Sequence, residues 1–133
     1  LIYPVRSYSY YDQNYHKAYM NSIGFYIKPA LEISPFKVAF PDEKSIGEDV
    51  LIINEKLYVV ANEKIAADKF KVYLYKTDNP TNKNSWQEVL HFRSRNRVRS
   101  FEYLDGKLYF GLGQNYDEPI GRSGEIISLP FRP

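Results

Sequence analysis

The 133-residue sequence contains no cysteine, which excludes a disulfide framework, a thiolate metal site and a cysteine nucleophile. Its only two histidines, His16 and His91, lie far apart and without acidic neighbours at metal-ligand spacing, so we expect no metal. Gly111 and Gly113 lack the third glycine and the following helix of a dinucleotide fingerprint, so no cofactor is expected. A Ser-His-Asp triad stays open, although no nucleophile-elbow sequence is present.

Charge and long apolar runs are also scarce. The formal net charge of +2 gives no general basic field, so we expect no nucleic-acid partner. No apolar run approaches the roughly 18 residues of a membrane helix, so we expect no membrane span. No signal peptide is visible, and the chain begins with Leu1 rather than Met. We therefore expect a fragment, a processed product or part of something longer; the compartment stays open, with a secreted or cell-surface location considered.

Aromatic residues are abundant, with 13 Tyr and 8 Phe, and this favours β structure. The stretch from Val98 to Leu129 predicts three strands, because apolar and polar residues alternate with a period of two. Asp105-Gly106 divides the first two strands and is a strong hairpin signal, since a primed two-residue turn needs positive φ. Gly111 and Gly113 indicate the end of the second strand or a close approach by another part of the chain.

Weaker copies of this stretch occur upstream. Val5–Asp12 aligns without a gap with Val98–Asp105, and Lys56-Leu57-Tyr58 matches Lys107-Leu108-Tyr109. Copies recur at intervals of roughly 40 to 50 residues, a period typical of propeller blades. We therefore predict an all-β fold of antiparallel four-stranded blades in an incomplete β-propeller. The approximate blades are residues 1–41, 49–92 and 98–133, and the alternative is a single β-sandwich or barrel.

The individual strands follow from the same alternation. In the second unit they are Asp49–Asn54, Lys56–Asn62, Phe70–Thr77 and Trp86–Phe92, with a loop at Glu63–Lys69. In the first unit they are Val5–Tyr10, Tyr15–Met20, Ser22–Lys28 and Phe36–Phe40, and a short helix remains open at Tyr15–Met20. The third unit has three strands and no fourth, so the remaining blades are expected on another segment or chain, or the piece closes the ring by self-association.

One loop carries a family resemblance. Thr77-Asp78, followed by Ser85-Trp86, resembles the Asp-box of sialidase-like propellers, which runs Ser-x-Asp-x-Gly-x-x-Trp between the third and fourth strands of a blade. Thr77 takes the Ser position, Asp78 the Asp position, and Trp86 opens the fourth strand; Pro80 replaces the glycine, and the loop is longer. The resemblance implies a propeller in which these residues brace a turn without catalysing. Asp78 is expected to cap backbone N–H groups of its own turn.

Two arginines and two tyrosines are the candidate ligand-binding residues. Arg6 and Arg99 match in the aligned copies, at the start of an expected inner strand. The resemblance implies arginines near the propeller axis that hold a carboxylate, and the planar guanidinium fork suits that task. Tyr10 and Tyr103 also match, and exposed rings of this kind stack on sugars. The alternatives are arginines that pair with acidic neighbours and tyrosines that are half-buried strand residues.

Arg93, Arg95, Arg97 and Arg99 alternate, so an extended segment would place them on one face, either as an anion-binding patch or as a solvated connector. Three functions are compared. The first is a non-catalytic part of a sialidase-like propeller that binds glycan or a protein partner. The second is part of a glycoside hydrolase or lyase, for which Glu102, Asp105, Asp117 and Glu118 offer unpaired carboxylates. The third is a structural protein of a surface or viral assembly, completed by strand addition. We expect binding rather than catalysis from this chain alone.

Overall fold

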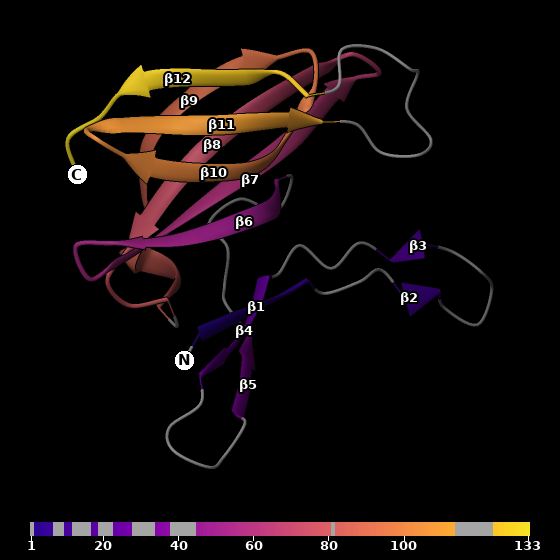
Figure 1. Cartoon of the computed structure of the whole chain (residues 1–133). Coiled ribbons are helices and arrows are strands. Elements are labelled where there is room, and N and C mark those ends of the chain that lie inside the picture. Colours follow the sequence, from indigo (N-terminus) through magenta and orange to yellow (C-terminus); the bar gives the residue numbers. More distant parts are fainter. Residues whose placement is uncertain are drawn as a thin grey trace.

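The chain is all-β and its strands pair antiparallel (Figure 1). The computed structural model describes residues 45–80, 82–113 and 124–133, apart from the side chain of Ile46, and the backbone of five short strands within residues 2–37. The main body consists of one sheet of four strands and one sheet of three. The predicted all-β antiparallel class is therefore confirmed.

The four-stranded sheet is a simple meander in which each strand pairs with the next, in the order β6-β7-β8-β9. Its strands are β6 (Ile46–Ile53), β7 (Lys56–Ala66), β8 (Lys69–Thr77) and β9 (Gln87–Ser94). All four were predicted, but the loop predicted at Glu63–Lys69 is wrong. β7 and β8 continue there as a two-stranded extension in which Glu63 pairs with Lys71, because opposite charges across the strands support pairing without a buried face.

The three-stranded sheet repeats the same meander, in the order β10-β11-β12. Its strands are β10 (Arg97–Leu104), β11 (Lys107–Gly113) and β12 (Ile126–Pro130). Asp105 and Gly106 join the first two strands with φ values of 50° and 72°, as the Asp-Gly signal predicted. Asn54 and Glu55 make the equivalent turn between β6 and β7, with φ values of 47° and 61°.

The first unit departs from the predicted four-stranded blade. It contains a three-stranded sheet in the order β1-β4-β5 and a separate pair of β2 with β3. The strands are β1 (Ile2–Arg6), β2 (Tyr10–Tyr11), β3 (Lys17–Ala18), β4 (Ile23–Ile27) and β5 (Ser34–Lys37). The single predicted strand Val5–Tyr10 is wrong, because β1 pairs with β4 only as far as Arg6 and Tyr10 belongs to a different hairpin.

Two further predicted segments of this unit, Tyr15–Met20 and Phe36–Phe40, differ from the observed strands in their bounds. Lys17 and Ala18 are strand rather than helix within Tyr15–Met20, and the rest of that segment lies outside the described residues. The strand predicted at Phe36–Phe40 begins earlier, at Ser34, because Pro35 sits inside β5 opposite Tyr26.

The two large sheets pack face to face over one apolar core. Its fully buried members come from both sheets: Tyr58, Val60, Val72 and Leu74 from the first, and Val98, Leu108 and Phe110 from the second. The opposite face of the four-stranded sheet is also buried and apolar, with Leu57, Val59, Ala61, Tyr73, Tyr75 and Trp86. The middle of β7 and β8 is therefore buried on both faces, whereas Ile52 of β6 and His91 of β9 are exposed on the second face.

Polar side chains join the two sheets where backbone pairing does not. The amide of Asn62 donates to the carbonyl of Val98 at 2.9 Å and accepts from the Val98 N–H at 2.9 Å. The carboxylate of Asp49 accepts from the Phe101 N–H at 3.1 Å. These contacts satisfy buried backbone groups of β10 along the seam with β6 and β7. Within the part of the chain that is described, no helix is long and apolar enough to cross a membrane.

Candidate functional site

The two predicted arginines occupy different kinds of position. Arg6 is the last residue of β1, opposite Ile23, so the prediction that it begins an inner strand is wrong. Arg99 lies near the start of β10, as predicted, and at the register shift between Val98 and Ser100. The alignment failed at Arg6 because β1 ends where its counterpart β10 continues. Only the backbones of Arg6 and Tyr10 are described, so no ligand contact can be assigned to them.

Arg99 forms an ion pair with the other sheet. Its Nη1 lies 3.7 Å from Glu48 Oε2, and Arg97 Nη1 lies 3.9 Å from Glu48 Oε1. The Glu48 side chain is only 4% exposed, whereas that of Arg99 is 37% exposed. Glu48 sits at the register shift of β6 between Gly47 and Asp49, so both Glu48 and Arg99 are bulge residues. Bulges re-aim side chains, and here they direct opposite charges across the seam.

The four alternating arginines do not share one face. β9 ends at Ser94, Arg95 and Asn96 form a turn, and β10 begins at Arg97. The prediction of a single extended arginine segment is therefore wrong, because the chain bends at Arg95 and Asn96, where it passes from one sheet to the other. The Arg97 guanidinium lies over the Phe70 ring, 5.0 Å from its centroid. The Arg97 side chain therefore packs against the protein as a cation–π partner.

Tyr103 is half-buried and contacts Phe131 edge-on, with ring centroids 6.1 Å apart. Tyr58, only 1% exposed, meets the same Phe131 ring at 5.9 Å. These tyrosines therefore belong to the core between the sheets, in the arrangement expected of half-buried strand residues.

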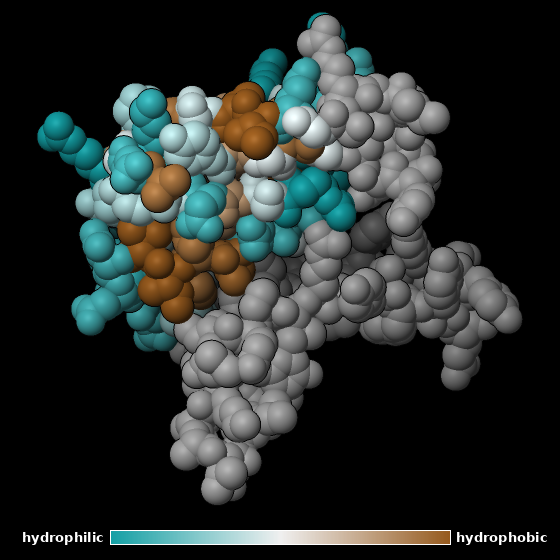
Figure 2. All heavy atoms as spheres, in the orientation of Figure 1, coloured by the Kyte–Doolittle hydropathy of each residue, from teal (hydrophilic) through white to brown (hydrophobic). Residues whose placement is uncertain are grey.

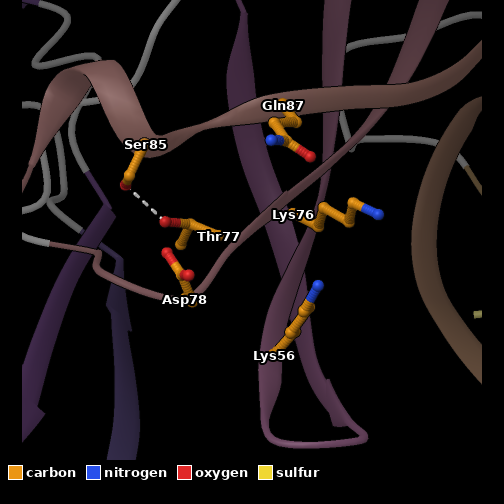
Figure 3. A pocket seen from close by; sticks show the side chains of 6 residues that line it. All are labelled: Lys56, Lys76, Thr77, Asp78, Ser85 and Gln87. Atoms are coloured by element: carbon orange, nitrogen blue, oxygen red, sulfur yellow. Dashed lines mark hydrogen bonds between the residues drawn. The ribbon is translucent and has the colours of Figure 1, made fainter.

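The Asp-box-like loop is braced by hydroxyl groups (Figure 3). The hydroxyls of Thr77 and Ser85 point toward each other and lie 2.5 Å apart. Thr77 Oγ1 also accepts from the Asn79 N–H at 3.0 Å, and Ser85 Oγ donates to the carbonyls of Asn79 and Asn82 at 2.6 and 2.7 Å. Thr77 thus makes the turn cap expected of Asp78, which is exposed. Trp86 is 8% exposed and packs on the Leu57 face of the sheet.

A small hollow lies beside this loop, between the ends of β7, β8 and β9. Its lining residues, drawn in Figure 3, are Lys56, Lys76, Thr77, Asp78, Ser85 and Gln87. Its volume is about 40 Å³, which is on the order of one or a few water molecules. The hollow is therefore too small to enclose a sugar ring.

Sequence reasoning missed a polar cluster on β7, β8 and β9. Tyr73 donates its hydroxyl to Glu63 Oε2 at 3.0 Å, and Lys71 Nζ lies 4.7 Å from the Tyr73 ring centroid. His91 Nδ1 is 2.5 Å from Glu88 Oε1, and its ring lies 6.1 Å from that of Tyr73. The available signal was the alternation of Lys71, Tyr73 and Tyr75, which places three side chains on one face of β8.

The electrostatics of this cluster oppose a nucleophilic tyrosine. Burial, joined by the hydrogen bond to Glu63, raises the pKa of Tyr73 above its ordinary value of 10.0. The hydrogen bond to Tyr73 raises the pKa of Lys71, which stays a cation. Tyr73 therefore stays a neutral phenol that donates to Glu63 and lies beside the Lys71 cation. Among the described residues, no three His, Asp or Glu side chains gather to hold a metal ion.

The fold defines the class of the molecule as an all-β chain whose two main sheets are antiparallel meanders. Comparison with protein-family models, with curated proteins and with solved structures finds no match.

Proposed function

We propose that the chain is a non-catalytic, binding part of a sialidase-like β-propeller, with a protein or a glycan as its partner. The observation that carries this proposal is that the central strands of the four-stranded sheet, β7 and β8, are buried on both faces. A sheet in a two-layer sandwich packs one face on the core and presents the other to water. A blade within a propeller packs both faces on neighbouring blades.

The repetition of the meander supports the same proposal. β10-β11-β12 follows the order of β6-β7-β8, and the two sheets stack face to face. The resemblance of the Thr77–Trp86 loop to an Asp-box points to this family of propellers, since the loop joins the third and fourth strands of its sheet and is braced as a rigid turn.

Binding is favoured over catalysis because three carboxylates of the described residues are engaged with other side chains; Asp117 and Glu118 lie outside the described residues. Glu63 accepts from Tyr73, Glu88 pairs with His91, and Glu48 pairs with Arg97 and Arg99. A glycoside hydrolase needs two carboxyl groups that face one cleft across the scissile bond. Partial contribution to such an active site is the runner-up.

A protein is the favoured partner because the large exposed apolar side chains among the described residues are aliphatic. Ile126, Ile65, Leu104 and Ile52 are 71%, 58%, 57% and 56% exposed. Among the tyrosines whose side chains are described, Tyr58, Tyr73 and Tyr75 are buried, and Tyr103 and Tyr109 are half-buried. Exposed isoleucines on an uncharged edge strand such as β12 favour contact with another polypeptide.

Structure determination of the longest native polypeptide that contains this chain tests the fold. Further sheets arranged radially with the two main sheets are expected. A closed two-sheet sandwich would overturn the propeller. Glycan-array binding and turnover of aryl glycosides and sialosides, measured on the same polypeptide, test the activity. Turnover that is lost in a Glu63→Gln or Glu88→Gln variant would overturn the non-catalytic proposal.

A further inference from the structure

We propose that the outer edge of β12 is a docking site for an extended peptide strand of a partner protein. The strand runs antiparallel to β12 and carries apolar side chains at alternate positions. This inference rests on the proposed protein-binding function and names its partner chemistry. Figure 1 shows β12 as the outermost strand of its sheet, and Figure 2 shows hydrophobic surface in the region where β12 lies.

The hydrogen-bond pattern fixes which groups of β12 face outward. Leu112 N–H donates to the Glu125 carbonyl at 2.8 Å, and Phe131 N–H donates to the Gly106 carbonyl at 2.8 Å. Because bonding alternates along an antiparallel strand, residues 127 and 129 also bond to β11. Ile126, Ser128 and Pro130 therefore direct their backbone groups away from the sheet. The edge offers two N–H donors, from Ile126 and Ser128, and three carbonyls.

β12 lacks the features that protect β9, the last strand of the four-stranded sheet, against pairing with another chain. β9 is also an edge, but it includes Glu88 and Arg93 and has a bulge opposite Leu74 and Tyr75. Charges and bulges are the devices that prevent edge pairing. β12 has the sequence Ile-Ile-Ser-Leu-Pro, without a charge, and only Pro130 blunts it. An uncharged edge with exposed isoleucines is a site of strand addition.

The core between the sheets is incompletely covered beside β12, where an added strand would pack. On the first sheet, β9 closes the core edge: Phe92 meets Phe110 with ring centroids 5.2 Å apart. On the second sheet, Ile127 pairs with Phe110 and shares its face, yet Ile127 is 36% exposed. A fourth strand with apolar residues on this face would cover Ile127 as β9 covers its neighbours. β9 alternates half-buried Leu90 and Phe92 with exposed His91 and Arg93, which is the expected pattern of the partner.

A second copy of the chain fits this edge less well than a different peptide. Antiparallel pairing of β12 with itself about Ser128 would place Pro130 opposite Ile126 twice. Proline lacks the N–H that such a pair needs, so each of the two outer pairs would lose a hydrogen bond. A different peptide meets Pro130 only once.

The experiment uses the 133-residue chain and a synthetic peptide with the β9 sequence, Gln87–Ser94. Titration followed by NMR is expected to shift the amide signals of Ile126 and Ser128 and to slow their hydrogen exchange. Ser128→Pro removes an outward N–H and no hydrogen bond to β11, and it should weaken binding at least tenfold, whereas Ser128→Ala should bind as the parent does. Peptides N-methylated on one edge or on the other avoid any change to the protein, and only one of the two should bind.

Three outcomes would overturn the inference. These are shifts confined to residues outside β12, equal binding by both N-methylated peptides, and dimerisation of the free chain that Ser128→Pro abolishes. The last result would assign the edge to a second copy. Any of them leaves the proposed propeller standing if the stacked sheets are found, so the two failures are distinguishable.

Discussion

Asn62 and Val98 form a two-bond clasp between the sheets, although they lie 36 positions apart in the sequence. Both hydrogen bonds measure 2.9 Å, and the two residues are 1% and 0% exposed. The side-chain amide of Asn62 offers one donor and one acceptor, as a backbone peptide does. It therefore satisfies the N–H and C=O of a β10 residue that has no neighbouring strand on that side.

Replacing Asn62 by alanine is expected to lower the free energy of unfolding by roughly 2–4 kcal/mol, because two buried backbone groups of Val98 lose their partner. Urea denaturation measures the change. Asn62→Asp keeps the acceptor and loses the donor. Asn84→Ala, at an exposed position of the β8–β9 loop, is the matched control and should lie within about 0.5 kcal/mol of the parent. A loss at Asn62 no greater than that of the control would contradict the clasp.

Gly113 lies against the side chain of Arg99, which occupies the space that a Cβ at position 113 would need. A Cβ built at Gly113 would lie 2.8 Å from Arg99 Cγ, which is closer than real contacts permit. Gly113→Ala is therefore expected to cost about 1–3 kcal/mol of stability. The cost should shrink when Arg99 is also replaced by alanine, because the obstructing methylene is gone. A double-mutant cycle by urea denaturation tests this coupling, and strictly additive losses would refute it.

Glu55 is the residue most open to stabilisation. Its φ of 61° lies in the left-handed region, which costs a side-chain-bearing residue about 1–2 kcal/mol. Glu55→Gly relieves this strain but adds flexibility to the unfolded chain, so a net gain of about 0.5–1 kcal/mol is expected. Thermal and urea unfolding measure the gain. The same substitution at Glu102, an exposed strand residue, should destabilise and serves as the contrast.

Alkaline pH is expected to weaken the fold through its buried tyrosines. Burial raises the pKa of Tyr73 and Tyr58 above the ordinary value of 10.0. Below pH 10 both folded and unfolded chains keep these protons, so their stabilising contribution is complete. Above pH 10 the unfolded chain releases protons first, and the free energy of unfolding falls as pH rises. Lys71, whose pKa is also raised, acts in the same direction.

Urea denaturation across pH 9 to 11 checks this dependence. Tyr73→Phe should give a shallower fall than the parent, although it also loses the hydrogen bond to Glu63, which contributes about 0.5–1.5 kcal/mol at neutral pH. Tyr58→Phe should flatten the fall as well. Parallel curves for the parent and both variants would show that these phenols do not titrate differently in the two states.

The strands of both main sheets were predictable because their signals are local. The Asp105-Gly106 turn and the period of two around Phe101 and Leu108 needed only a few neighbouring residues. The equivalence of Arg6 with Arg99 failed because similar local sequence does not specify which strand pairs with which. Tyr10 follows the same alternation as Tyr103, yet it belongs to a separate hairpin.

The side-chain networks were not predictable, because each joins residues that are distant in sequence. Glu48 meets Arg97 and Arg99 only after both bulges have formed, and no local pattern announces a bulge. The Asp-box resemblance located a braced loop but assigned its cap to Asp78, whereas Thr77 makes it. A hydroxyl and a carboxylate compete for the same turn, and sequence alone does not rank them.

The Asn62–Val98 clasp has a consequence for the order of folding. Each meander is built from hairpins between neighbouring strands, and such short-range contacts close early. The clasp must wait until two independently formed sheets meet. Its substitution should therefore leave the folding rate nearly unchanged and accelerate unfolding, with a φ-value near zero. The side-chain amide of Asn62 therefore controls the unfolding rate of the assembled pair of sheets.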